Sequence, residues 1–211
     1  MTSIHVRVQH HPARQHGLPQ LLHHLPSSVK VVEHSSSPPD PWAGYRQCLT
    51  DLPDTSHVLV IQDDALPVPG FWDAVERLAE AQPDRPVCLW MSAIPADAAI
   101  RAYKAHGKQS LIPLGPSPFV PLVCVLWPTW QARAFLEWSE KVPRLMTKAD
   151  DGNVARWMRT ERIEFLVAVP SICEHDDWVP SVKGGQMGAT NGASKIRVAL
   201  LLAEDASTIT W

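Results

Sequence analysis

An apolar run that ends on two adjacent carboxylates constrains the fold of this chain more than any other feature. Residues 57–64 read HVLVIQDD, and the uninterrupted apolar stretch from Val58 to Ile61 predicts a strand that is buried on both faces. Such strands occur in open α/β sheets that helices cover, and ligands of these sheets bind beyond the carboxyl ends of the strands. The sequence therefore predicts a functional site at Asp63 and Asp64.

Two carboxylates side by side restrict what this site can bind. They repel each other unless a cation or a set of hydrogen-bond donors lies between them. A hard divalent cation that also binds a phosphate group would neutralise Asp63 and Asp64. This combination points to a nucleotide diphosphate substrate and to a group-transfer reaction.

The residues around this strand alternate between strand and helix patterns. Strands are expected at 4–8, 29–33, 58–61 and 87–91, and helices at 17–25, 42–52 and 70–81. This order favours a mostly parallel sheet with right-handed crossovers. The predicted fold class is therefore α/β, a single Rossmann-like domain with a mostly parallel central sheet flanked by helices.

The second half of the chain is less regular. Helices are expected at 95–106, from Trp127-Pro128 to about 141, and at 150–159, with short apolar runs at 110–114 and 120–126 and a final strand at 163–169. From Cys173 onward we expect loops, with 198–202 returning as a strand or a short helix. We expect Trp127, Trp130, Trp138 and Trp157 to pack helices, and Trp42 and Trp178 to lie at loop edges where they could stack on a ligand.

Length and composition exclude several classes of protein. A chain of 211 residues fits one domain, or one domain with a short appendage, and its net charge of −3 argues against a large basic surface for nucleic acid. Its four cysteines form no CxxC pair, which argues against a zinc ribbon and favours a reducing compartment. We expect no signal peptide and no membrane span, and hence a cytoplasmic protein.

The acid motif resembles the nucleotide-sugar signature of GT-A glycosyltransferases. The resemblance lies in residues 56–67, SHVLVIQDDALP, followed by Gly70-Phe71. It extends to residues 10–14 (HHPAR), to Asp150-Asp151 and to residues 170–175 (PSICEH), and it covers most of the chain to about residue 185. The order is that of a GT-A enzyme: an acid motif after the third strand, an acidic helix start and a late histidine. The small size is similar to that of glycosyltransferases from actinobacteria and their phages.

The resemblance implies a single GT-A-like domain over residues 1–211. Residues 1–92 would form the nucleotide-binding half, 93–185 the acceptor and metal half, and 186–211 a C-terminal tail. It also implies a metal, Mn²⁺ or Mg²⁺, held by Asp64 and His175. An imidazole ligand favours Mn²⁺ of the two.

The resemblance assigns roles to further residues. Asp63 would face the ribose or support the metal site. Gln62 stands at the first position of the motif, where many relatives carry an acid. Whether this position takes part in metal coordination therefore stays open. In an inverting enzyme Asp151 would be the base that takes the acceptor's proton, with Asp150 supporting the acceptor. If transfer is retaining, neither needs to be a base, and either residue could instead cap the helix.

Three basic residues complete the predicted donor site. Arg14 and His10 follow the first strand at the expected nucleotide edge, where Arg14 could pair with a phosphate, stack on a base or remain solvated surface. Lys183 lies in a glycine-containing loop that could close over the diphosphate and offset the charge of the leaving group.

The expected reaction moves a sugar from a nucleotide-diphosphate sugar, by default a UDP-sugar, to a hydroxyl. The acceptor stays open between a protein such as a virion protein, a hydroxymethylated DNA base and a small molecule; a phage-encoded enzyme would act in the host cytoplasm. A nucleotidyltransferase is an alternative, although residues 9–12 (QHHP) lack the glycine-rich basic loop that it would need. A non-catalytic sugar-nucleotide-binding module is a second alternative, for which Gln62 leaves room.

Overall fold

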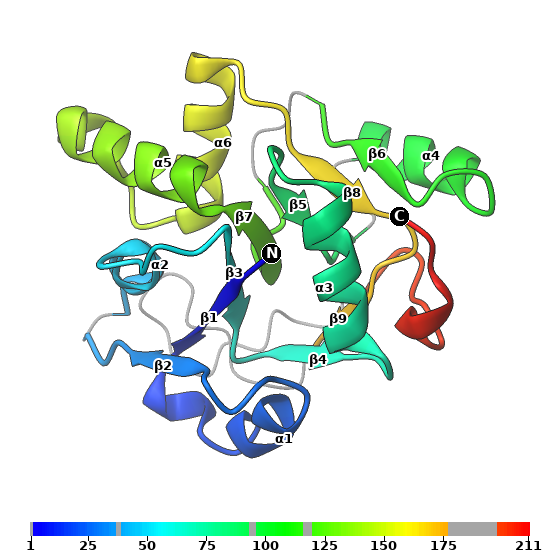
Figure 1. Cartoon of the computed structure of the whole chain (residues 1–211). Helices are drawn as coiled ribbons and strands as arrows, with labels where there is room; N and C mark the ends of the chain where they lie inside the picture. The colour runs from blue at the N-terminus through cyan, green and yellow to red at the C-terminus, as the bar shows by residue number, and fades with distance from the viewer. Residues whose placement is uncertain (1, 37–38, 93–95, 116–119, 177–197) are drawn as a thin grey trace.

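A computed structural model describes residues 2–36, 39–92, 96–115, 120–176 and 198–211 of the chain. Its main feature is a seven-stranded sheet in the order β2-β1-β3-β7-β5-β8-β6, beside a small sheet of β4 and β9 (Figure 1). The strands are β1 (Ile4–His10), β2 (Lys30–Glu33), β3 (His57–Gln62), β4 (Ala65–Pro67), β5 (Val87–Cys88), β6 (Leu111–Pro113), β7 (Cys124–Pro128), β8 (Leu166–Ala168) and β9 (Cys173–His175).

Most strands of the large sheet run in one direction. β1 pairs in parallel with both β2 and β3, and β5 pairs in parallel with β8. β7 is antiparallel to β3 and β5, and β6 is antiparallel to β8, so these two strands run the other way. The predicted α/β class, with a mostly parallel central sheet flanked by helices, is confirmed.

Helices cover both faces of the sheet (Figure 1). On one face lie α1 (Leu18–His23) and α3 (Phe71–Ala81), and on the other α2 (Pro41–Leu49), α4 (Ala96–Ala105), α5 (Thr129–Lys141) and α6 (Asp150–Glu161). The 3₁₀ turns η1 (Pro12–Arg14) and η2 (Pro143–Leu145) lie in connections, and η4 (Ala206–Thr208) lies in the C-terminal segment.

Strand β3 contributes side chains to both hydrophobic cores. Leu59 and Ile61 face the core that includes α1 and α3, while Val58 and Val60 face the core of the other four helices. Successive side chains of a strand point to opposite faces, so an unbroken apolar run fills both layers. All four side chains are fully buried, which confirms the expectation for this strand.

An aromatic cluster fills the second core. The Trp127 ring stacks on Phe135, with centroids 5.9 Å apart and planes at 6°, and meets Phe165 edge-on at 5.0 Å. The indole Nε1 of Trp127 donates a hydrogen bond of 3.0 Å to the hydroxyl of Tyr45. Both of these residues are fully buried, so each side chain satisfies the other's polar atom inside the core.

Some expectations for the second half of the chain are wrong. Trp127 and Pro128 end strand β7, opposite Val58 and His57, and helix α5 begins only at Thr129. Both residues are buried and belong to the same apolar run as the rest of the strand. A proline is tolerated at a strand end, where its missing N–H leaves no hydrogen bond of the sheet unmade. Trp130 is 55% exposed rather than packed between helices.

Residues 173–175 are a strand and not the expected loop. β9 pairs antiparallel with β4, a strand that the sequence analysis missed. Both strands are three residues long and pair across more than 100 residues of chain, so neither has a periodic pattern of its own. Residues 198–202 form neither a strand nor a helix, and only an isolated bridge joins Leu202 to Ser171.

Trp42 lies inside a helix rather than at a loop edge. Helix α2 begins at Pro41, and the Asp40 side chain caps it by accepting a 3.0 Å hydrogen bond from the amide of Ala43. The Trp42 ring packs on Phe135 at a centroid distance of 5.6 Å. This packing gives Trp42 a structural role in place of the expected stacking on a ligand.

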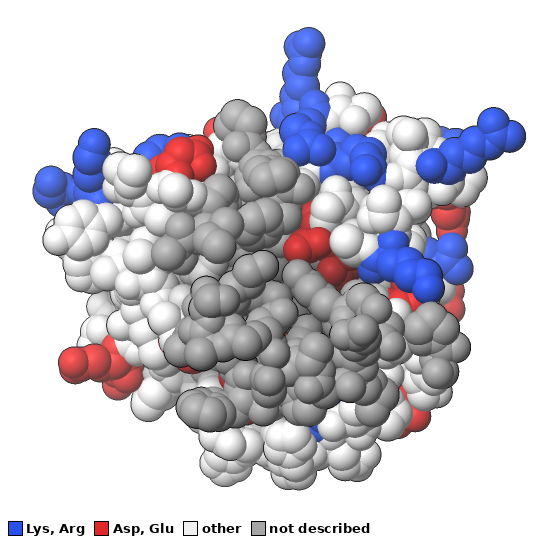
Figure 2. Space-filling model, turned by 180° about the vertical axis from the view of Figure 1, so that it is seen from behind, with Lys and Arg blue, Asp and Glu red and all other residues white. Residues whose placement is uncertain are grey.

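The cysteines and the charged side chains can be compared with the composition. All four cysteines are free and buried. Figure 2 shows that the described part of one face carries acidic as well as basic side chains, in keeping with the low net charge. In the described residues, no helix combines the length and the apolar character that crossing a membrane requires.

Removal of the Tyr45 hydroxyl should destabilise the aromatic cluster. Tyr45→Phe keeps the ring but leaves the buried Nε1 of Trp127 without its acceptor, so we expect a loss of about 1–3 kcal/mol in the free energy of unfolding. Urea denaturation of the purified protein measures this. The matched control is Tyr103→Phe at a side chain that is 73% exposed, where we expect no loss. Equal stability of the two variants would contradict the assigned role of the hydrogen bond.

Candidate functional site

The two carboxylates lie where strand β3 leaves the large sheet. The amide of Asp63 donates a 3.1 Å hydrogen bond to the carbonyl of Gln9, so pairing with β1 continues one residue beyond β3. Asp63 and Asp64 are 4% and 3% exposed, and the chain then turns into β4. Burial of two adjacent acids requires compensation from neighbouring donors.

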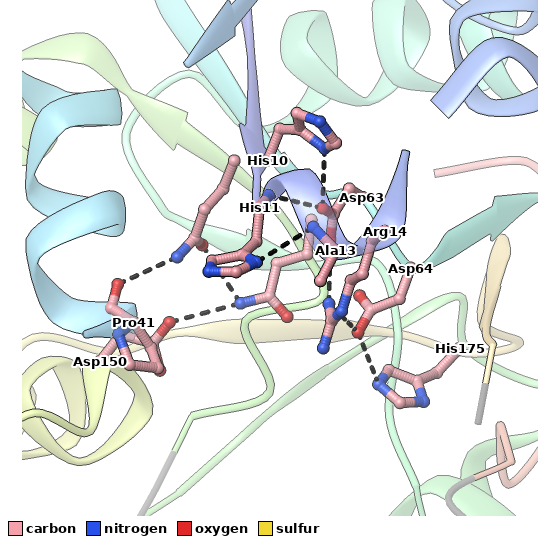
Figure 3. Close-up of polar contacts among 11 residues, drawn as sticks. His10, His11, Ala13, Arg14, Pro41, Asp63, Asp64, Asp150 and His175 are labelled. Atoms are coloured by element: carbon pink, nitrogen blue, oxygen red, sulfur yellow. Dashed lines mark hydrogen bonds and ion pairs between the residues drawn. The ribbon is translucent and has the colours of Figure 1, made fainter. Parts of the chain in front are cut away.

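The segment after β1 provides the donors for Asp63 (Figure 3). Its Oδ2 accepts hydrogen bonds from the backbone amide of His11, at 2.8 Å, and from Nδ1 of His10, at 2.9 Å. The ring of His11 also caps turn η1 by accepting a hydrogen bond from the amide of Ala13. This turn directs the next side chain, Arg14, back toward the acid pair.

Arg14 contacts both carboxylates through one nitrogen. Its Nη1 lies 2.9 Å from Oδ1 of Asp63 and 2.6 Å from Oδ2 of Asp64 (Figure 3). The residue is 8% exposed, so the alternative that Arg14 is solvated surface is wrong. The chain itself therefore places a positive charge between the two acids.

Strand β9 brings His175 to the same carboxylate. Ala65 is the register partner of His175, and the amide of Asp176 donates a 2.7 Å hydrogen bond to the carbonyl of Asp64. Nε2 of His175 lies 3.2 Å from Oδ2 of Asp64, the oxygen that Arg14 also contacts. The indole of Trp90 lies against the imidazole at a centroid distance of 5.5 Å.

The surroundings shift the pKa values of the two acids in opposite directions. Burial favours a neutral Asp64, but the charge of Arg14 and the hydrogen bond from His175 outweigh it and hold the pKa of Asp64 well below its ordinary value. Burial raises the pKa of Asp63, and the neighbouring Asp64 adds to this, against the opposing effects of Arg14 and the His11 amide. Burial opposes the charge of Arg14, yet the two carboxylates raise the pKa of its guanidinium.

A second chain of polar contacts joins the acid motif to the start of helix α6. Nε2 of Gln62 donates to Oδ2 of Asp150 at 3.3 Å and to Oε1 of Gln9 at 3.2 Å, and Nε2 of Gln9 donates to the carbonyl of Pro41 (Figure 3). The sequence analysis missed Gln9, although β-sheet register makes it the partner of Gln62. Asp150 thus lies at the same edge of the sheet as the acid pair.

The two acids at the start of α6 differ in their surroundings. Asp150 is 5% exposed, and its Oδ1 accepts a hydrogen bond from the amide of Asp151. Asp151 is partly exposed, and its Oδ1 accepts from the amide of Gly152. Each side chain accepts a hydrogen bond from one amide of the first helical turn, while Ala149 occupies the N-cap position itself.

Asp64 and His175 are suited to hold a divalent cation. Oδ1 of Asp64 is buried and has no hydrogen-bond partner in the described part of the chain, and its Oδ2 adjoins the imidazole. Within the same residues no group of three or more His, Cys, Asp or Glu side chains could hold a metal by itself. Carboxylate and imidazole suit Mn²⁺, and a bound phosphate group could provide the remaining oxygen ligands.

Two predicted ligand-binding residues lie outside the described residues, namely Lys183 and Trp178. The structure brings the other predicted donor and metal residues together at the end of β3. These are His10, Arg14, Gln62, Asp63, Asp64 and His175.

No protein-family model matches the sequence, and no curated protein matches it. Among solved structures, the chain is similar to the crystal structure of A197 from STIV, with 13% sequence identity and a TM-score of 0.49 over 83% of this chain and 85% of that chain. A likeness of this size carries no argument about the family or the function of this chain.

The low pKa of Asp64 predicts how its contribution to stability depends on pH. Its folded-state pKa lies below the unfolded value of about 3.9, so the ionised carboxylate stabilises the fold at neutral pH and loses this effect as the pH falls below about 4. We expect Asp64→Asn to lose about 1.5–3 kcal/mol at pH 7, with a difference from the unaltered protein that narrows below pH 4.

Urea denaturation at several pH values between 7 and 3 measures this difference. The control is Asp54→Asn, because the side chain of Asp54 is fully exposed. Its free energy of unfolding should equal that of the unaltered protein at every pH. A difference for Asp64→Asn that stayed constant down to pH 3 would show that the ionised carboxylate does not account for the stabilisation.

Proposed function

We propose that the protein is a metal-dependent glycosyltransferase that moves a sugar from a nucleotide-diphosphate donor to a hydroxyl group. The observation that supports this is the contact between Asp64 and His175, in which Oδ2 of Asp64 lies 3.2 Å from Nε2 of His175. The two residues are 111 positions apart in the sequence. They stand at the two positions that the resemblance to GT-A enzymes assigns to the metal. Asp150 adjoins the same motif through Gln62.

The residues present agree with the chemistry of such a transfer. A divalent cation at Asp64 and His175 would neutralise the charge that develops on the departing nucleotide diphosphate. Asp63 already accepts three hydrogen bonds, from His10, the His11 amide and Arg14. This favours a role for Asp63 in holding the site in place over direct contact with the ribose.

One observation favours the alternative of a non-catalytic sugar-nucleotide-binding module. Arg14 provides a positive charge for the acid pair within the chain, so the pair does not need a metal in order to remain buried. Nucleotidyl transfer gains less support, because the segment after β1 forms the short turn η1, and its arginine contacts the acids. Donor turnover separates an enzyme from a binding module.

Donor binding should require both the metal and its two ligands. We expect a UDP-sugar with Mn²⁺ to raise the melting temperature, because a ligand that binds only the folded state stabilises it by mass action. His175→Ala and Asp64→Asn should each abolish the part of this shift that depends on Mn²⁺. A thermal-shift screen of nucleotide sugars, with and without Mn²⁺, measures it.

The matched control for this screen is His23→Ala, an exposed histidine on helix α1, which should respond like the unaltered protein. If no nucleotide sugar gives a metal-dependent shift, the proposed function is wrong. A shift with tight binding but no release of UDP on long incubation, with acceptor hydroxyls present, would favour the binding module.

Asp151 should act in the transfer step and not in donor binding. If it takes the proton of the acceptor, Asp151→Asn should lower turnover by about 10²–10⁴-fold and leave the affinity for UDP and Mn²⁺ unchanged. Release of UDP in a coupled assay and UDP titration calorimetry measure the two effects. Full activity of Asp151→Asn would exclude this residue as the base and would be the expected result for a retaining enzyme.

A further inference from the structure

We infer, on the premise of the proposed function, that Arg14 is an internal cation that holds the acid pair until the donor binds, and that it thereby couples metal binding to nucleotide binding. Oδ2 of Asp64 receives Nη1 of Arg14 at 2.6 Å and Nε2 of His175 at 3.2 Å. A metal ion bound by Asp64 and His175 would lie next to the guanidinium.

This arrangement sets two positive charges against each other. Arg14 and the cation would compete for the same carboxylate, and like charges in a buried site repel strongly because little solvent screens them. Without a nucleotide, the guanidinium already contacts Oδ2 of Asp64 and offsets its charge. Mn²⁺ alone should therefore bind weakly.

The acid pair does not depend on Arg14 alone to keep its position. Oδ2 of Asp63 stays bonded to the His11 amide and to Nδ1 of His10, and Asp64 stays next to His175. The backbone is held on both sides: the amide of Asp63 donates to the carbonyl of Gln9, and the carbonyl of Asp64 accepts from the amide of Asp176, which follows β9. The guanidinium can thus leave while the carboxylates remain in place.

A nucleotide diphosphate offers Arg14 a new partner. Guanidinium groups bind phosphate oxygens with two parallel hydrogen bonds, and a diphosphate carries more negative charge than one carboxylate. Transfer of Arg14 to the diphosphate would free Asp64 for the metal, and the metal would in turn bind phosphate oxygens. Metal and nucleotide should therefore each strengthen the binding of the other by the same factor.

The experiment measures Mn²⁺ affinity directly and does not depend on sugar transfer. Electron paramagnetic resonance of free Mn²⁺ gives the dissociation constant for the full chain with and without UDP, corrected by a protein-free titration of Mn²⁺ with UDP. For the unaltered protein we expect UDP to tighten Mn²⁺ binding by tenfold or more. For Arg14→Met we expect Mn²⁺ alone to bind at least tenfold tighter than in the unaltered protein, with a smaller further effect of UDP.

Two further variants keep the test valid if Arg14→Met folds poorly. Arg14→Lys retains a positive charge and should bind Mn²⁺ alone as weakly as the unaltered protein. The double variant Arg14→Met with Asp63→Asn removes one charge of each sign and so preserves the net charge of the site. It should still bind Mn²⁺ alone more tightly, since the competitor for Asp64 is gone.

The outcomes separate this inference from the proposed function. Failure of every form of the protein to bind Mn²⁺, with or without UDP, would overturn both. Two other outcomes would overturn only the inference about Arg14 and leave the proposed function standing. One is that the unaltered protein binds Mn²⁺ no more weakly than Arg14→Met and the double variant do. The other is that UDP changes the Mn²⁺ affinity equally in all of these proteins.

Discussion

The guanidinium of Arg14 between two buried carboxylates is the interaction on which this edge of the structure depends. Two adjacent acids that are 4% and 3% exposed can stay ionised only if donors surround them. The donors come from two segments that are distant in sequence, residues 10–14 at the end of β1 and just beyond it, and His175 on β9. The charge requirement of Asp63 and Asp64 therefore joins β1, β3 and β9 at one point.

The central part of the fold could be predicted from the sequence because its signals are local. Strand β3 is an unbroken apolar run, and both of its faces are buried, as such a run requires. Helix α3 carries Phe71, Val75 and Leu78 at helical spacing, and all three are buried. The acid pair was found for the same reason, since it directly follows a strand whose limits are clear.

Other features depend on contacts between distant segments, and the sequence alone does not reveal those. Nothing in residues 10–14 distinguishes a solvated arginine from a buried one; the difference is a contact with Asp63, 49 residues away. The pairing of β4 with β9 is of the same kind, because three residues are too few to show a period. His175 was singled out through a resemblance, and its place beside Asp64 follows from this pairing.

The amide at position 62 fits the charge balance of the site. Gln62 donates hydrogen bonds to Asp150 and to Gln9, which a carboxylate could not do. An acid at this position would add a negative charge beside Asp63, Asp64 and Asp150, where the guanidinium of Arg14 already has two carboxylates to offset. Gln62 instead links helix α6 to the sheet without adding charge. The amide at the first position of the motif therefore contacts Asp150, on the side of the predicted acceptor, while the proposed metal site is assigned to Asp64 and not to Gln62.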